Sequence, residues 1–122
     1  MQSFLANPGA AYRRVDIDAR IEAAANEDLT RICLEEASSA LGQALIALGR
    51  EPETPPREPL ARAHGIAIYL ARAVAADNPM RKALIQFYGG LADVLARNMS
   101  QARYAEIAQV RKDFEDVLGA FA

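Results

Sequence analysis

Few side chains in this sequence of 122 residues could take part in catalysis. It contains one histidine, His64, and one cysteine, Cys33, and it has no glycine-rich phosphate loop and no metal-binding pair of cysteines. Acidic pairs such as Glu35 and Glu36 are adjacent in sequence. Adjacent side chains on a helix point about 100° apart, so such a pair does not converge on a substrate. We therefore expect a protein that is not an enzyme and that holds no cofactor and no metal.

His64 is the one residue that suggests a reaction, because a lone histidine in a four-helix bundle is also the arrangement of histidine phosphotransfer domains. The segment 63–68 resembles their motif, in which a lysine and a glycine usually follow the histidine within one turn. Here those positions hold Ala67 and Ile68, so a phosphoryl group would meet an apolar wall without a cation. A structural histidine is the better interpretation, and phosphotransfer through His64 stays as the alternative. Cys33 is likewise read as a small core residue.

The charge and composition exclude several classes of partner. The formal net charge is −2 and the pI is about 5.4, so the chain lacks the basic surface that nucleic acids require. It has no apolar run long enough for a bilayer and no recognisable signal peptide, so we expect no membrane insertion and a cytoplasmic location. The length fits a single domain over residues 1–122.

Three stretches carry apolar residues at spacings of three and four, which is the pattern of one helical face. Their apolar positions are Leu29, Ile32, Cys33, Leu41, Leu45 and Leu48; Met80, Leu84, Phe87, Tyr88, Leu91 and Leu95; and Tyr104, Ile107, Phe114, Val117, Leu118 and Phe121. A fourth stretch, residues 60–74, is apolar on nearly every side and must be covered on more than one face. The sequence therefore predicts an all-α protein, an antiparallel four-helix bundle.

The first helix is predicted over residues 27–48. Asn26 can cap it, because its side chain can accept hydrogen bonds from free amides of the first turn. Residues 1–25 are then expected to form an N-terminal arm or an extra helical turn. Residues 49–59 contain four of the six prolines, and they are expected to form an exposed loop.

The remaining helices are expected to follow through short connections. The second begins near Pro59, where proline suits the first turn. Asp77 or Asn78 can cap a third helix that starts at Pro79, so the second and third helices run antiparallel. A similar break at residues 98–100 leads into the fourth helix.

Four glycines fall inside predicted helices, where each costs about 1 kcal/mol relative to alanine. They are Gly42, Gly65, Gly89 and Gly90. Either they allow one bundle helix to pack closely on another, or they belong to a shallow groove for an amphipathic partner helix. The small residues that would floor such a groove include Ala71, Ala92 and Ala96. The sequence leaves both explanations open.

The order of several short segments resembles the flagellar export chaperones of flagellin. Residues 11–15 (Ala-Tyr-Arg-Arg-Val) look like the tyrosine-bearing opening of that family, and residues 23–26 (Ala-Ala-Ala-Asn) stand at its small-residue break. Later matches are Phe87-Tyr88 for a Leu-Tyr pair, residues 97–99 for an Ala-Asn-Leu turn and residues 105–107 for the start of the last helix. The chain departs from the family at residues 34–36, where Tyr-Asp-Gly is usual, at residues 89–90, where Asp-Tyr is usual, and in lacking Ser-Pro before the first helix.

This resemblance implies a cytosolic chaperone that binds the C-terminal helical segment of flagellin, prevents premature polymerisation and assists flagellar type III protein export. Other flagellar export components are further candidate partners. By analogy, Tyr12 and Val15 would form a removable plug over the groove. The expected partner-binding residues are Tyr12, Val15, Ile32, Ile66, Tyr69, Leu70, Leu91 and Leu95. A generic helical adaptor or homodimer is a further alternative.

Overall fold

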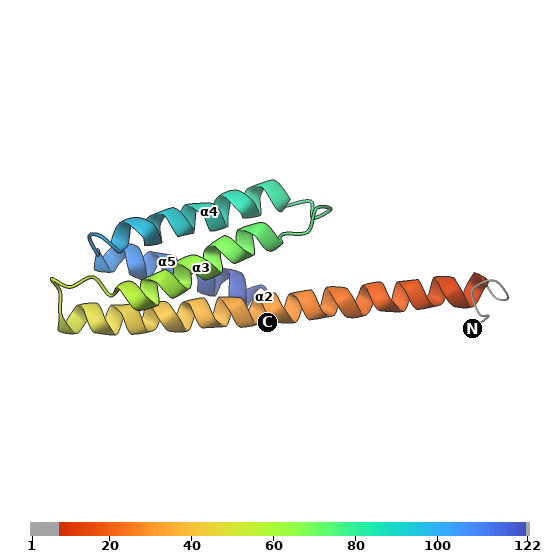
Figure 1. Cartoon of the computed structure of the whole chain (residues 1–122), viewed down its shortest axis with the longest axis horizontal. Coiled ribbons are helices and arrows are strands. Elements are labelled where there is room, and N and C mark those ends of the chain that lie inside the picture. The colour runs from red at the N-terminus through yellow and green to blue at the C-terminus, as the bar shows by residue number, and fades with distance from the viewer. Residues whose placement is uncertain (1–7, 122) are drawn as a thin grey trace. The chain divides into compact units, whose positions relative to one another are not determined.

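A computed structural model of the chain describes residues 8–121, without the side chains at positions 8–16, 19, 22 and 23. Its helices are α2 (Pro8–Arg50), α3 (Arg57–Ala73), α4 (Arg81–Asn98) and α5 (Tyr104–Gly119), and the described residues contain no strand (Figure 1). The predicted all-α class with four helices is confirmed. The chain forms two compact units, Met1–Thr30 and Arg31–Ala122. The expectation of a single domain stays a prediction.

Helix α2 continues through the position where the sequence analysis placed a break. Residues 8–25 are helical, and Thr30 Oγ1 donates a hydrogen bond to the Asn26 carbonyl oxygen at 2.9 Å, as happens inside a helix. No proline or glycine occurs between Ala10 and Leu41, and the alanines and arginines there favour a helix. The helix propensity lost at one asparagine is smaller than the propensity that these residues contribute, so the helix continues through Asn26. The predicted helix start after Asn26 was wrong. Residues 1–7 of the expected arm lie outside the described residues.

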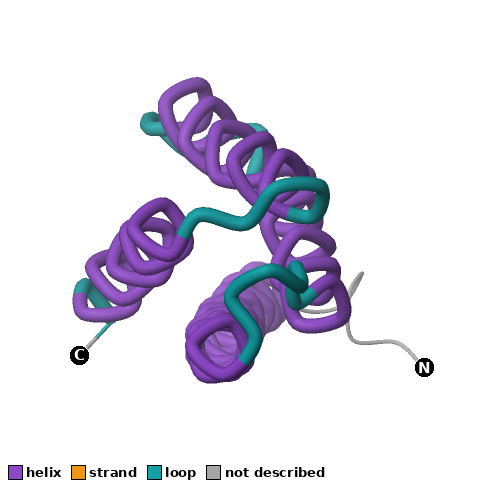
Figure 2. The backbone as a smooth tube through the Cα atoms, turned by 90° about the vertical axis from the view of Figure 1, so that its left-hand side faces the viewer, coloured by secondary structure: helices purple, strands orange, loops and turns teal. Residues whose placement is uncertain are grey.

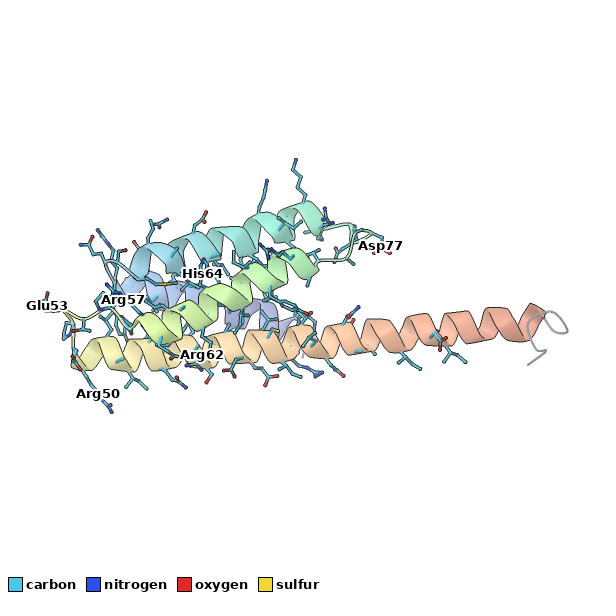
Figure 3. All side chains as sticks on the ribbon, in the orientation of Figure 1. Arg50, Glu53, Arg57, Arg62, His64 and Asp77 are labelled. Atoms are coloured by element: carbon cyan, nitrogen blue, oxygen red, sulfur yellow. The ribbon has the colours of Figure 1, made fainter. Side chains whose placement is uncertain are left out.

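In the second unit, residues 31–50 of α2 form a bundle with α3, α4 and α5. Helices α3 and α4 pack together in opposite directions and are joined by residues 74–80 (Figure 1). Figure 2 looks onto the end of the bundle that carries the loops 51–56 and 99–103. Glu53 and Asp77 mark opposite ends of the bundle (Figure 3). The predicted antiparallel arrangement is therefore present in this unit.

The core of the bundle combines leucines with many alanines. Small residues at a helix contact let the two backbones approach closely, which the alanine-rich stripes allow here. The buried apolar residues are Leu34, Ala37, Ala40, Leu41, Ala44, Leu48, Leu60, Ala63, Ala67, Leu70, Tyr88, Leu91, Ala92, Leu95, Ile107, Val110 and Phe114.

The loop between α2 and α3 is shorter than predicted, because α2 continues to Arg50 and α3 begins at Arg57. Residues 51–54 are exposed as expected, but Pro56 is buried. Arg57 Nε donates to the Met99 carbonyl oxygen at 3.0 Å. This bond ties the start of α3 to the end of α4.

Asparagines shape the other two connections. Asn98 is fully buried, and its Nδ2 donates to the Val94 carbonyl oxygen at 2.8 Å and to Glu106 Oε1 at 3.0 Å. Its Oδ1 accepts from the Arg103 amide at 2.6 Å, so one side chain holds the α4–α5 turn. The predicted break at residues 98–100 is confirmed. Asn78 Oδ1 accepts from the Met80 amide at 2.8 Å, and α4 begins at Arg81 rather than at the predicted Pro79.

Candidate functional site

The residues singled out for chemistry do not assemble into a reactive centre within the described residues. No three His, Cys, Asp or Glu side chains there are grouped so that they could hold a metal ion. His64 is half-buried on α3 (Figure 3). Cys33 is half-buried against the core, and burial raises the pKa of its thiol, which disfavours the nucleophilic thiolate. Cys33 is therefore a packing residue, as the sequence indicated.

The structure separates the expected partner-binding residues into three groups. Ile32 and Tyr69 are exposed, and Ile66 is half-buried. Leu70, Leu91 and Leu95 are 3%, 6% and 0% exposed, so they belong to the core and no partner can contact them in this structure. The side chains of Tyr12 and Val15 lie outside the described residues, and the plug stays a prediction.

The misplacement of the three leucines has a physical cause. Periodicity shows that a helix has an apolar face, but it does not show whether that face meets its own bundle or a partner. Leu91 and Leu95 lie on the stripe of α4 that packs in the core. Leu70 lies on α3, where residues 60–74 are apolar around most of the helix. Its side chain is on the face of α3 that the rest of the bundle covers.

The four glycines noted in the sequence also fall into two groups, according to whether another side chain lies close to them. A Cβ added at Gly42 would lie 3.0 Å from Arg111 Nη2, whereas a Cβ at Gly65, Gly89 or Gly90 would meet nothing within 4 Å. Close approach inside the bundle therefore explains Gly42 and does not explain the other three.

Gly42 makes room for a polar link between α2 and α5. Arg111 Nε donates to the Ser38 carbonyl oxygen at 3.1 Å, and Ser38 Oγ donates to Glu115 Oε2 at 3.1 Å. Ser38 is itself buried, so its hydroxyl needs this partner. The link fixes the position of the Arg111 guanidinium over Gly42.

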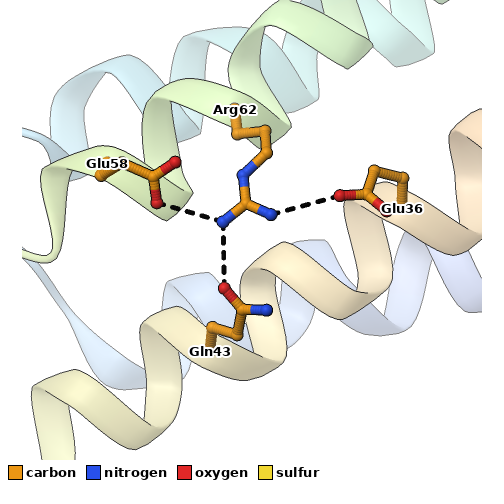
Figure 4. A network of polar contacts seen from close by, with 4 residues as sticks. All are labelled: Glu36, Gln43, Glu58 and Arg62. Atoms are coloured by element: carbon orange, nitrogen blue, oxygen red, sulfur yellow. Dashed lines mark hydrogen bonds and ion pairs between the residues drawn. The ribbon is translucent and has the colours of Figure 1, made fainter.

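A second polar link joins α3 to α2 through Arg62 (Figure 4). Its Nη2 donates to Glu58 Oε2 at 3.0 Å and to Gln43 Oε1 at 2.9 Å, and its Nη1 donates to Glu36 Oε1 at 3.2 Å. The hydrogen bonds to Glu58 and Glu36 raise the pKa of Arg62. Arg62 therefore holds α3 to α2 as a permanent cation.

The groove suggested by the small residues is not one continuous surface. Ala92 is buried in the core, Ala71 is half-buried and Ala96 is exposed. The sequence analysis assigned all three residues to one groove floor. Alanine occurs both in buried helix contacts and on exposed surfaces, so residue type alone does not distinguish the two.

The first unit carries an exposed row of aliphatic side chains that the sequence analysis did not select as a site. Ile17, Ile21 and Leu29 are 52%, 62% and 44% exposed. They recur at multiples of four residues, so together they span an arc of about 120° on the helix. No described side chain of this unit is buried. We call these three residues the α2 row, and their spacing by multiples of four residues was the signal that could have revealed it.

Compared with known proteins, the chain matches no protein family, no curated protein and no solved structure. No relative therefore supplies a function or a set of site residues. None of the described helices combines the length and the apolar character of a membrane span.

Proposed function

We propose that this chain is a cytosolic export chaperone that binds the C-terminal helical segment of flagellin, prevents its premature polymerisation and assists type III export. The observation that carries the proposal is the α2 row, large aliphatic side chains left exposed in a unit in which no described side chain is buried. The resemblance of short sequence segments to flagellin chaperones supplies the identity of the client.

An amphipathic client helix is the partner that suits such a row. Exposed apolar side chains at helical spacing pair with the apolar face of a second helix, and the covered residues are read as i, i+4 anchors. Fully burying an isoleucine or leucine side chain stabilises a complex by about 1.5–3 kcal/mol relative to leaving it exposed. The contacts of the α2 row would therefore offset part of the entropy lost when a disordered client segment folds on binding.

The surface of the bundle adds apolar residues beyond the α2 row. Ile32 on α2 and Tyr69 on α3, which the sequence analysis expected to bind a partner, are exposed and therefore accessible to one. Ile66 is half-buried and offers a smaller contact. These residues belong to the second unit and extend the set of candidate anchors.

A polymerisation assay tests the proposed activity. Flagellin monomers from the same organism are seeded with short filament fragments, and growth is followed by light scattering with and without an equimolar amount of this protein. We expect the protein to suppress growth. The double variant Ile17→Gln/Ile21→Gln should suppress it less, because glutamine keeps the helix propensity and removes the apolar contact. Ile46→Gln, at an equally exposed position elsewhere on α2, is the matched control. Growth that is unaffected by the unmodified protein would refute the proposal.

A further inference from the structure

The outward surface of α3 has a composition that the bundle does not explain. We define the α3 outer face as Glu58, Ala61, Gly65, Tyr69 and Arg72, all of which are exposed. Their spacings of three and four residues place them within an arc of about 80° on the helix. The face lies opposite the buried residues of α3, Leu60, Ala63, Ala67 and Leu70. It combines the exposed aromatic ring of Tyr69 with Gly65, against whose Cβ position no atom of the bundle packs.

The α3 outer face is symmetric about Gly65. Ala61 and Tyr69 lie four residues on either side of this glycine, and Glu58 and Arg72 lie seven residues on either side. When two copies of such a helix pair in opposite directions with Gly65 on the two-fold axis, each residue faces the one at the same distance on the other side. The small Ala61 then faces the large Tyr69, and Glu58 faces Arg72.

The shape of the face suits this pairing. Gly65 costs about 1 kcal/mol relative to alanine inside a helix, and a Cβ there would meet nothing within 4 Å of its own chain. At a two-fold axis the missing Cβ lets two backbones approach closely. The Tyr69 ring then reaches over Ala61 of the second copy, where a larger residue would hold it away. The half-buried Ile66 and Ile68 border the face and add apolar contact.

The charges specify the direction of the pairing. In the antiparallel arrangement each Glu58 meets an Arg72, whereas a parallel arrangement would place Glu58 against Glu58 and Arg72 against Arg72. Like charges opposed across an interface disfavour it. Glu58 already accepts a hydrogen bond from Arg62 of its own helix, but its side chain is 76% exposed and can accept a further one.

We propose that the α3 outer face is the interface of an isologous homodimer, in which α3 of a second copy packs antiparallel with Gly65 at the two-fold axis. A second copy fits this face because the face complements itself. One helix face is small for an interface, so the dimer dissociates on dilution. The dimer would cover Tyr69 and Ile66, which the proposed function offers only as additional anchors. It does not involve the α2 row and needs no flagellin, so either proposal can fail without the other.

Sedimentation equilibrium over a range of protein concentrations tests the dimer. The unmodified protein should show a monomer–dimer equilibrium, and Gly65→Leu should weaken the dimer by about tenfold or more, because the leucine fills the space at the axis. Gly90→Leu is the matched control, since Gly90 is also a helical glycine with open space, and its dimer should match that of the unmodified protein. A protein that stays monomeric at all concentrations, or a Gly65→Leu variant that dimerises normally, would overturn the proposal.

A charge exchange tests the pairing of Glu58 with Arg72. Arg72→Glu alone should weaken the dimer, because two carboxylates then face each other, and the double variant Glu58→Lys/Arg72→Glu should recover it. Circular dichroism verifies that each variant stays helical. Failure of the double variant to recover the dimer, with helicity unchanged, would contradict the charge pairing.

Disulfide formation tests the direction of the helices. In a Cys33→Ser background, a mixture of Ala61→Cys and Tyr69→Cys chains should form a disulfide between the two variants, and each variant alone should not. A disulfide formed by Ala61→Cys chains alone would indicate a parallel pair and would overturn the proposed geometry.

Discussion

Glycine has two different roles in these helices, and the difference can be measured at the scale of one residue. At Gly42 a Cβ would approach the Arg111 guanidinium, which is held by its bond to the Ser38 carbonyl oxygen. At Gly65 the space is open. The same mutation should therefore have different effects at the two positions.

Gly65→Ala should stabilise the monomer by about 0.4–1 kcal/mol, because alanine reduces the entropy of the unfolded chain and meets no obstacle. Gly42→Ala should lose this gain, because Arg111 has to move or break its hydrogen bond. Urea unfolding of both variants under monomeric conditions measures the difference. Equal stabilisation of the two variants would show that Arg111 moves away freely.

Asn98 is the residue on which the α4–α5 turn depends. It is fully buried, and its side chain makes three hydrogen bonds, to the Val94 carbonyl oxygen in α4, the Arg103 amide in the turn and Glu106 in α5. Asn98→Ala should reduce the free energy of unfolding by about 1–3 kcal/mol, because the Arg103 amide and Glu106 lose their partner. Ser100→Ala, at an exposed position of the same turn, should change it by no more than about 0.5 kcal/mol. A loss at Asn98 as small as that at Ser100 would contradict the role of the buried asparagine.

At the scale of helices, the last three elements could be predicted from the sequence to within a few residues. Proline, asparagine and glycine interrupt the apolar periodicity near each of their ends, and these residues act locally. The start of α2 could not be predicted, because Asn26 has the same local signature at a cap as in the middle of a strong helix. The long alanine- and arginine-rich stretch before it decided the outcome.

Asn26→Ala separates these two roles of the asparagine. If Asn26 were an N-cap, alanine would destabilise the helix by about 0.5–2 kcal/mol. Inside a continuous α2, alanine should instead favour the helix by up to about 0.7 kcal/mol. Amide hydrogen exchange across residues 20–30 measures the effect, and we expect slower exchange in the variant. Faster exchange would indicate that the helix begins at Asn26.

The candidate site was only partly predictable for a related reason. Ile32 and Tyr69 were selected because their apolar side chains stand at helical spacing, and both are exposed, so a partner could reach them. Leu70, Leu91 and Leu95 have the same spacing, but the bundle covers them. Which apolar side chains are covered depends on how the helices pack, and that is a property of the tertiary structure.

The assignment of Leu91 to the core has a direct test. Leu91→Ala should destabilise the bundle by about 2–5 kcal/mol, because it removes buried methyl groups and leaves a cavity. Ile46→Ala, at an exposed position, should stay within about 0.5 kcal/mol of the unmodified protein. Thermal or urea unfolding gives both values. A small effect at Leu91 would place this side chain on an accessible surface after all.

At the scale of the whole molecule, the chain has one well-packed helical bundle and an N-terminal unit without a buried side chain among those described. The bundle is held together by its buried core and by the polar links that Arg62 and Arg111 make between helices. The α2 row has no such explanation within its unit. This contrast is why we assign the row to a partner and expect binding to be driven by apolar contact.

Calorimetric titration of this protein with the C-terminal segment of flagellin from the same organism measures whether the protein binds this segment and whether the α2 row contributes to the affinity. We expect saturable one-to-one binding with a large negative heat-capacity change, since apolar surface is buried and the segment folds on binding. The affinity should be weaker by about tenfold or more for Ile17→Gln/Ile21→Gln and unchanged for Ile46→Gln. Absence of binding by the folded, unmodified protein would contradict the chaperone assignment, and equal affinity of the double variant would contradict the role of the α2 row.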